Sequence, residues 1–285
     1  MTKPYDPFAP FEWKLAHDRR LTLGPEGHIM GVVNVTPDSF SDGGQFLEPG
    51  NAVEQAKSLF NDGAVMIDVG GESSRPGAEE ISGEEECRRI LPVIEQLAQI
   101  PDMLISVDTW RASTAEKALA AGAHVINDIW GFQRDPELAP LAAEKKAGCI
   151  LMHTGRGREK LPDPVEDQMF FLSKSIERAS YAGIEATRIV LDPGFGFAKD
   201  ASENVTILAN LEKLFELGQP ILTGTSRKRF IGEITDRPAE ERDVGTSATT
   251  VVARMKGSAI FRVHDVATNM DALKIADAVL SSYAR

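Results

Sequence analysis

The sequence predicts a (β/α)8 barrel, an α/β fold, preceded by a short N-terminal β-hairpin extension. From residue 28 onward, short runs rich in β-branched residues alternate with longer helical patterns. Eight such runs occur, and most are apolar throughout, as is typical of parallel strands buried on both faces. Eight strand–helix repeats in about 250 residues match the usual size of this barrel.

The expected strands are, in order, HIMGVVNV, AVMIDVGG, MLISVDT, HVINDI, GCILMH, RIVLDPG, PILTGTS and AIFRVHD. Between them, stretches such as residues 52–63 and 84–99 carry apolar side chains at helical spacing. Several helices are expected to end at a glycine before the next strand, namely Gly63, Gly122, Gly148, Gly183 and Gly218. The competing architecture is a doubly wound open sheet. That fold usually has fewer strands and a Gly-rich turn after the first one, and no G-x-G-x-x-G follows the first strand here.

Residues 1–27 do not fit the repeat. The segment FEWKLAHDRRLTLGPEG predicts a short hairpin that would cover the N-terminal end of the barrel. No linker rich in Pro, Gly or Ser interrupts the chain, so we expect residues 28–285 to form a single barrel domain.

Composition and charge exclude several classes of function. A formal charge of −12 argues against nucleic-acid binding through a broad basic face, although a local cationic pocket is compatible with it. No apolar run is long enough to cross a bilayer, and the N-terminus lacks the apolar core of a signal peptide. Two cysteines are too few for a disulfide framework. We therefore expect a cytoplasmic protein that binds neither nucleic acid nor membrane.

Polar, charged or sulfur-bearing side chains stand at the end of every predicted strand, where barrels of this kind build their active sites. They are Asn34, Asp68, Asp108, Asn127 with Asp128, Met152 with His153, Asp192, Ser226 with Arg227 and Lys228, and Arg262 with His264 and Asp265. Asp128 and Asp265 taken singly are expected to be helix or turn caps, and His153 a structural hydrogen bonder. The whole set favours one convergent site.

Three of these side chains are hydrogen-bond acceptors: Asp108, Asn127 and Asp192. A heterocycle with several ring N–H and amino groups needs such partners in a closed pocket, because unpaired buried donors are costly. The acceptors therefore predict a donor-rich ring as one end of the ligand.

A second group of side chains is cationic and consists of Arg75, Lys228, Arg262 and His264. Arginine can hold phosphate oxygens bidentately, so this group predicts an anionic second end of the ligand. The loops GGESSRPGA and DPGFGFAKD contain glycines that let the backbone approach a ligand closely. In the latter, Phe197 could present an aromatic face to a flat substrate or simply pack under the loop.

The sequence carries no complete metal or nucleophile motif. It lacks H-E-x-x-H and a His-x-His after the first strand, which disfavours a zinc hydrolase, and it lacks G-x-S-x-G. Mg²⁺ remains compatible with the sequence, because it needs few protein ligands when substrate phosphates supply the others.

Long motifs in the sequence resemble those of dihydropteroate synthase: NVTPDSFSDGG, DVGGESSRPGA and DPGFGF. The segments SVDT, NDI, LMH, SRKRFIG and RVHDV resemble the same family in the same order, and the likeness extends from Trp13 to the C-terminus. That family is a (β/α)8 TIM barrel that joins 4-aminobenzoate to 6-hydroxymethyl-7,8-dihydropterin diphosphate, giving 7,8-dihydropteroate and diphosphate. The resemblance implies small-molecule substrates, Mg²⁺ as cofactor and a homodimer.

The resemblance also implies roles for individual residues. The pterin would be held by Asp108, Asn127, Met152, Asp192 and Lys228. The diphosphate would be bound by Asn34, Arg75, Arg262 and His264, with Mg²⁺ at Asn34. The 4-aminobenzoate would contact Phe40, Ser74, Arg75, Phe197, Ser226 and Lys228. Catalysis would depend on Asp42, Arg75, Asp108 and Lys228.

The reaction chemistry agrees with this set of residues. Cations and Mg²⁺ would neutralise the charge that grows on the leaving diphosphate, while the electron-rich pterin spreads positive charge from its methylene carbon. The arylamine then attacks a carbocation-like carbon, so no protein nucleophile is required. We expect Asp42 to stabilise that cation or to position the amine.

Three features depart from the family pattern. Thr154 stands where a second Met commonly follows the His, Ala198 replaces a common Gly, and Ser74 replaces a common Thr. The basic stretch of residues 156–160 is expected to be a solvated loop that could alter substrate access.

Two other functions are compatible with a pterin-binding barrel. One is a methyltetrahydrofolate methyltransferase that works with a corrinoid protein, which would not need the Ser-Arg-Pro-Gly loop or the Arg-x-His pair. The other is a non-catalytic pterin-binding or partner protein on the same scaffold. Five intact residues argue against the second: Asp42, Arg75, Lys228, Arg262 and His264.

Overall fold

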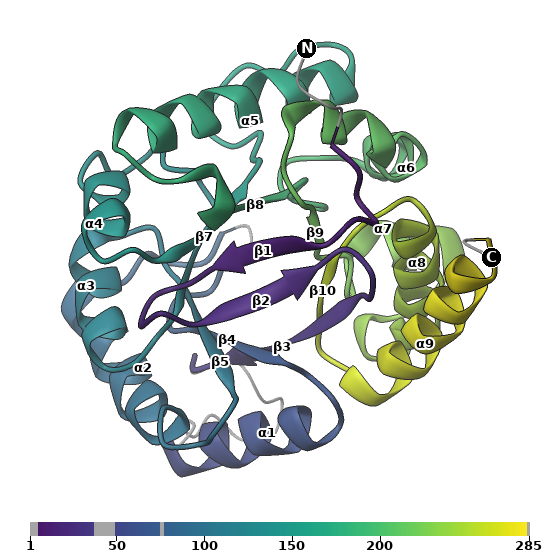
Figure 1. Cartoon of the computed structure of the whole chain (residues 1–285). Coiled ribbons are helices and arrows are strands. Elements are labelled where there is room, and N and C mark those ends of the chain that lie inside the picture. The colour runs from purple at the N-terminus through teal and green to yellow at the C-terminus, as the bar shows by residue number, and fades with distance from the viewer. Residues whose placement is uncertain (1–4, 37–48, 75–76, 284–285) are drawn as a thin grey trace.

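The computed structural model describes residues 5–36, 49–74 and 77–283, which form a parallel barrel surrounded by helices (Figure 1). The eight-stranded sheet has the order β8-β7-β6-β5-β4-β3-β10-β9. Its strands are β3 (His28–Asn34), β4 (Met66–Gly70), β5 (Leu104–Asp108), β6 (Val125–Asp128), β7 (Gly148–Met152), β8 (Ile189–Asp192), β9 (Leu222–Thr223) and β10 (Ile260–Val263). A single parallel bridge between Leu191 and Ile221 joins β8 to β9. The barrel prediction is confirmed, and the doubly wound alternative is wrong.

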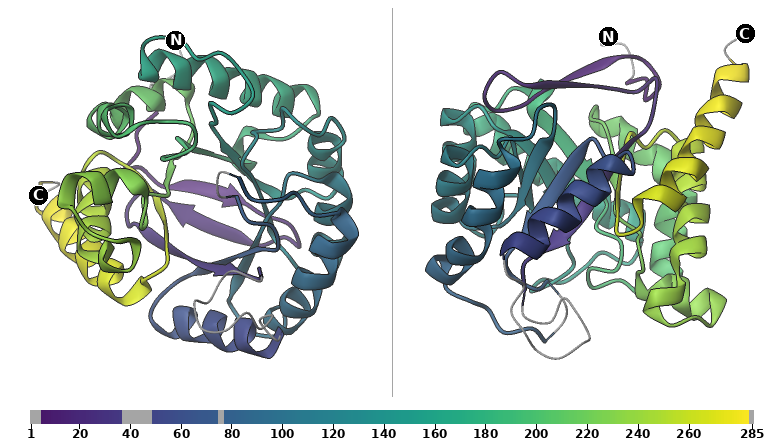
Figure 2. Two further views of the ribbon diagram at one scale, coloured as in Figure 1. Left: turned by 180° about the vertical axis from the view of Figure 1, so that it is seen from behind. Right: turned by 90° about the horizontal axis from the view of Figure 1, so that it is seen from below.

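Helices cover the outside of the barrel between successive strands (Figures 1 and 2). They are α1 (Pro49–Asn61), α2 (Gly83–Leu97), α3 (Ala112–Ala120), α4 (Leu138–Glu144), α5 (Pro164–Tyr181), α6 (Ala201–Ala209), α7 (Arg229–Thr235), α8 (Asp243–Met255) and α9 (Val266–Tyr283). None of these described helices is long and apolar enough to span a bilayer.

Four of the five glycines expected at helix ends adopt positive φ, as predicted, and Gly148 does not. Gly148 is the first residue of β7, and the left-handed position after α4 is taken by Lys146 instead. A Cβ atom at Gly148 would lie 2.5 Å from the side chain of Leu15. Glycine therefore stands there because the N-terminal segment packs against the start of β7.

The N-terminal segment forms the predicted hairpin, in which β1 (Phe11–Lys14) pairs antiparallel with β2 (Arg20–Leu23). It lies across one end of the barrel (Figures 1 and 2). Trp13 is 0% exposed, and its indole N–H donates to the carbonyl of Arg188 at 2.9 Å. Trp13, Leu15 and Leu23 share one apolar cluster with the first inward residues of the barrel strands. This end is filled with side chains, so the open end lies at the carboxyl ends of the strands.

Candidate active site

Inward side chains recur every second residue along a barrel strand, and on several strands they change from apolar near the hairpin to polar near the carboxyl end. On β4, Met66 belongs to the apolar cluster under the hairpin and Asp68, two residues later, is polar. On β10, Ile260 and Arg262 repeat the same change. The strands therefore bring their polar residues together inside the barrel, above its apolar floor.

Asp68 joins three strands at the centre of this polar layer. Its side chain is 0% exposed, and Oδ2 accepts hydrogen bonds from Asn127 Nδ2 at 3.0 Å and from Arg262 Nε at 2.7 Å. Arg262 also donates through Nη2 to Asp108 Oδ2 at 3.0 Å. The guanidinium of Arg262 thus links the carboxylates of Asp68 and Asp108, and the carboxylate of Asp68 links Arg262 to the amide of Asn127.

This network leaves acceptor atoms without partners. Because Asn127 gives its Nδ2 to Asp68, its Oδ1 is turned the other way and is buried with no hydrogen bond among the described residues, as is Asp68 Oδ1. Asp192 accepts from the backbone N–H of Gly194 through Oδ1 at 2.7 Å. Its Oδ2 lies 3.8 Å from the position that a Cβ at Gly224 would take. A ligand with N–H donors would satisfy these acceptors.

Burial raises the pKa of both predicted pterin carboxyls. The pKa of Asp108 is raised because the group is buried and because the charge of Asp68 lies nearby, while Arg262 acts in the opposite direction. The pKa of Asp192 is raised by burial, and its hydrogen bond from Gly194 opposes the rise. A donor-rich ligand would stabilise the ionised form of both groups.

Lys228 lies over the loop that follows β8. Its aliphatic stem comes within 3.1 Å of the position that a Cβ at Gly196 would take, and the φ of 80° at this position also favours glycine. Its ammonium lies 4.4 Å from the ring centroid of Phe197. Burial, and then the charge of Arg262, lowers the pKa of Lys228 to about 8.

The turn that carries Lys228 is fixed by the start of α8. Arg227 adopts a left-handed φ of 57° and forms two hydrogen bonds to Asp243, at 2.8 and 2.7 Å. Arg242 donates to the carbonyls of Arg227 and Lys228 at 3.1 and 3.5 Å. A side chain at Gly232 would overlap the guanidinium of Arg242. These contacts hold Lys228 at the mouth of the barrel.

Ser226 and His264 are brought into contact, although the sequence assigned them to different substrates. Ser226 Oγ lies 2.9 Å from His264 Nδ1 and accepts the backbone N–H of His264 at 3.1 Å. The predicted aminobenzoate and diphosphate sides therefore meet at this pair.

Asn34 ends β3 beside Asp108. Asn34 Oδ1 and Asp108 Oδ2 lie 3.6 and 3.7 Å from the position that a Cβ at Gly70 would take. The described residues contain no group of three or more His, Cys, Asp or Glu side chains that could hold a metal. One or two oxygens from Asn34 and Asp108 fit a hard cation that takes its other ligands from phosphate and water.

The remaining described site residues lie around the loop after β8. Met152 is buried, and a Cβ at Gly194 would come within 3.1 Å of its Cγ. Phe197 is 8% exposed and is flanked by the cations of Lys228 and Arg156. The carbonyl of Ser74 accepts from Arg156.

The expectation of a solvated loop at residues 156–160 holds for Gly157 and Glu159, which are exposed, but not for the three basic side chains, which are half-buried. Arg158 forms two hydrogen bonds to Asp167 on α5, at 2.8 and 2.6 Å. Lys160 donates to the carbonyl of Ala198 at 2.8 Å and pairs with Glu203 on α6. Partners on other elements hold this basic stretch against the barrel.

The three side chains expected to be structural have such contacts. Asp128 accepts from the backbone N–H groups of the turn after β6, and Asp265 accepts from the backbone N–H of Thr268 at the start of α9. His153 contacts Asp167 through Nε2 at 2.9 Å, and burial lowers its pKa to about 3. These geometries agree with the expected structural roles.

Phe40, Asp42 and Arg75 lie outside the described residues, so their predicted roles stay predictions. Sequence reasoning missed two others. Asp68 was noted as a strand end without a role, although a lone Asp inside the apolar strand MIDVG was a signal for one. Arg156 was taken as part of a solvated loop, and its sequence context gave no signal of its partners.

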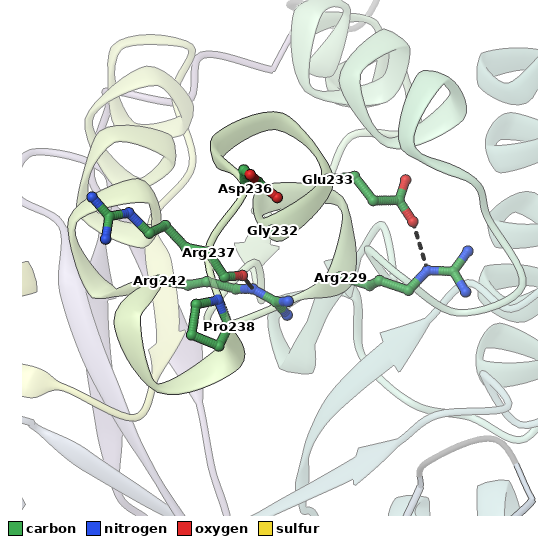
Figure 3. Close-up of a pocket in the computed structure, with 7 residues that line it drawn as sticks. All are labelled: Arg229, Gly232, Glu233, Asp236, Arg237, Pro238 and Arg242. Carbon is green, nitrogen blue, oxygen red and sulfur yellow. Dashed lines mark hydrogen bonds and ion pairs between the residues drawn. The ribbon is translucent and has the colours of Figure 1, made fainter.

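A cavity of about 500 Å³ lies beside α7, outside the barrel mouth (Figure 3). It is lined by Arg229, Gly232, Glu233, Asp236, Arg237, Pro238 and Arg242. Arg229 pairs with Glu233 there at 2.8 Å. None of the predicted substrate residues lines this cavity, so we do not assign it to the reaction.

Comparison with known proteins agrees with this geometry. The family described as pterin binding enzyme matches residues 30–264. A dihydropteroate synthase of Clostridium beijerinckii is 45% identical over 263 residues, covering 92% of this chain and 97% of the relative. Among solved structures, Xanthomonas albilineans dihydropteroate synthase with 4-aminobenzoic acid has a TM-score of 0.89 at 42% identity, covering 94% and 98% of the two chains. The Clostridium difficile enzyme in the presence of pteroic acid has a TM-score of 0.86 at 44% identity, covering 90% and 98%. The chain therefore belongs to the pterin binding enzyme family, and the relatives named here are dihydropteroate synthases.

Proposed function

We propose that the chain is a transferase that condenses 6-hydroxymethyl-7,8-dihydropterin diphosphate with 4-aminobenzoate, giving 7,8-dihydropteroate and diphosphate in folate biosynthesis. One observation carries this proposal: an acceptor without a hydrogen-bond partner and two cationic side chains share one barrel mouth. Asn127 Oδ1 is buried without a partner among the described residues, and Lys228 and Arg262 lie close enough to Asp192 to oppose the rise of its pKa. A pterin diphosphate has the complementary distribution, with ring donors at one end and anionic oxygens at the other.

The pterin ring would lie on the acceptor side. Asn127 and Asp192 would accept hydrogen bonds from its N–H groups. Asp108 would be a third acceptor while Arg262 stays paired with its second carboxylate, Asp68. Met152 would supply the apolar wall. The buried, unpaired Oδ1 of Asn127 supports this orientation, since leaving it unpaired costs about 1–3 kcal/mol.

The diphosphate would lie on the cationic side. Arg262 has five N–H donors, and two of them are used by partners among the described residues, so others could bind phosphate oxygens. His264 and the loop residue Arg75 would complete this side. Asn34 would hold Mg²⁺ through its side-chain oxygen, and the ion when bound would neutralise charge on the diphosphate.

Catalysis would proceed by SN1-like loss of diphosphate. The pterin CH2–O bond breaks and its electron pair leaves with the diphosphate, whose charge Arg262 and Lys228 stabilise. The arylamine nitrogen then forms the new C–N bond and loses a proton. Asp42 would stabilise the cationic methylene or position the amine.

The 4-aminobenzoate would lie against the loop after β8. Phe197 would contact its ring, and the hydroxyl of Ser226 would face its far end together with Lys228. Ser74, Phe40 and Arg75 belong to the two loops proposed to cover it. The contact between Ser226 and His264 supports a short distance between the two substrates.

Incubation of the purified protein with pterin diphosphate, 4-aminobenzoate and Mg²⁺ tests the proposal. A synthase releases diphosphate and forms dihydropteroate, and both depend on 4-aminobenzoate being present. A corrinoid-dependent methyltransferase would release no diphosphate but would accept methyltetrahydrofolate, and a non-catalytic protein would bind the pterin only. Absence of dihydropteroate would refute the proposal.

We also propose a homodimer. Two neighbouring outer helices carry exposed apolar side chains: Val244 on α8, and Ile275 and Tyr283 on α9. Light scattering coupled to gel filtration tests the dimer. A measured mass of a single chain would refute it. The cytoplasmic location and the single barrel domain of residues 28–285 stay predictions, which cell fractionation and limited proteolysis test.

A further inference from the structure

Arg156 is a half-buried cation on the loop that follows β7. Its guanidinium lies 4.7 Å from the ring centroid of Phe197, and Nη2 donates to the carbonyl of Ser74 at 2.6 Å. The ammonium of Lys228 lies 4.4 Å from the same ring. Two cations therefore approach one aromatic ring, and both contacts of Arg156 belong to the side proposed for 4-aminobenzoate.

Arg156 has no acidic partner among the residues that the structure describes. The neighbouring basic residues do: Arg158 pairs with Asp167, and Lys160 pairs with Glu203. Burial lowers the pKa of Arg156, and no acidic group among the described residues acts in the opposite direction. A partly desolvated charge without a counter-charge is costly, and an arriving anion would remove that cost.

The loop holds Arg156 in place before any ligand arrives. Its backbone N–H donates to Thr154 Oγ1 at 3.2 Å, which a methionine at position 154 could not accept in this way. A Cβ at Gly155 would lie 2.7 Å from the side chain of Lys160. The departure from the family pattern at Thr154 thus has a structural consequence, because it helps to fix the cation two residues later.

We propose that Arg156 supplies the counter-charge for the carboxylate of the arylamine substrate and so determines specificity for an arylcarboxylate. This inference rests on the proposed function. Among the described residues, the guanidinium gives one N–H to Ser74, and its other N–H groups can bind carboxylate oxygens as a planar fork. Phe197 would contact the aromatic ring of the same substrate, and Lys228 would add positive charge on its other side.

The test compares two arylamines that differ in charge: 4-aminobenzoate and the neutral 4-aminobenzamide. We expect wild type to prefer the benzoate. Arg156→Gln should lower kcat/KM for the benzoate about tenfold or more, from loss of a charge-assisted hydrogen bond, and leave the benzamide nearly unchanged. Arg156→Lys should keep part of the preference. KM for pterin diphosphate and the thermal midpoint should stay close to wild type.

Arg229→Gln is the matched control, because Arg229 follows Lys228 directly but its side chain is 79% exposed and paired with Glu233. It should keep the full preference for the benzoate. Equal loss on both arylamines in Arg156→Gln would mean a structural role and would overturn the inference, as would an unchanged preference. A wild-type protein that converts neither arylamine would refute the proposed function itself.

Discussion

Asp68→Asn changes a buried group that joins the acceptor side of the site to its cationic side. Asp68 Oδ2 accepts from both Asn127 and Arg262, and the side chain is fully buried. The substitution keeps the volume but removes the charge. If the new amide keeps its oxygen at the position of Oδ2, both hydrogen bonds can remain, but Arg262 loses a charged partner. If its N–H faces Asn127 instead, that amide turns over and loses its orientation.

The size of the effect follows from these contacts. A hydrogen bond to a charged group contributes about 1.5–3 kcal/mol. Breaking a buried ion pair outright costs about 3–5 kcal/mol, but Arg262 keeps its contact with Asp108 at 3.0 Å, so the lower range applies. We expect a loss of about 2–3 kcal/mol in unfolding free energy. A similar loss of transition-state binding would lower kcat/KM for pterin diphosphate about 30-fold to 150-fold.

Urea unfolding and steady-state diphosphate release measure the two effects. Asp68→Asn should also lower the pKa of Asp108, because the charge of Asp68 is one cause of its rise, and a carboxyl NMR titration would detect this change. Asp62→Asn is the control, since Asp62 is exposed at the end of α1. A folded Asp68→Asn protein with unchanged affinity for pterin diphosphate would refute the reasoning.

Three further predictions concern the charge of Lys228, the opening loop and the hairpin. The pKa of Lys228 is lowered to about 8, so the positive charge of its ammonium is lost as the pH rises through 8. We therefore expect kcat/KM to fall above that pH. Lys228→Arg should move this fall to higher pH if the amine is the titrating group. Asp42→Asn should reduce turnover much more than binding of pterin diphosphate, measured by kinetics and calorimetry, and equal losses in both would exclude the proposed role. Trp13→Ala should lower unfolding free energy by about 3–5 kcal/mol, because it empties a fully buried site under the barrel. Substrate KM values should not change in that variant, since Trp13 lies at the end of the barrel opposite the active site, and a changed KM would contradict that placement.

Local pattern was enough to predict the barrel and most of the described site residues. Continuous apolar runs such as GCILM are buried strands, and polar residues that follow such runs reach the barrel mouth because parallel strands all point the same way. This rule alone predicts that Asp192 and Lys228 lie at the barrel mouth. The rule uses only the local sequence and does not depend on which side chains contact one another.

Pairing between distant segments could not be predicted in the same way. Arg262 was assigned to the diphosphate, but its contact with Asp68 joins residues 194 positions apart and depends on how β10 lies near β4 around the barrel. Gly148 looked like a helix end because its contact with Leu15 is invisible in the local sequence. Arg156 looked solvated for the same reason, since its partners Ser74 and Phe197 come from other loops.

A crystal structure with pterin diphosphate bound tests the central claim most directly. The account predicts that the ring lies in the barrel mouth with N–H donors on Asn127 Oδ1 and Asp192 Oδ2, and that the diphosphate lies against Arg262 and His264. A pterin bound anywhere else, including the cavity beside α7 in Figure 3, or bound in the mouth with its diphosphate turned away from Arg262, would contradict the account.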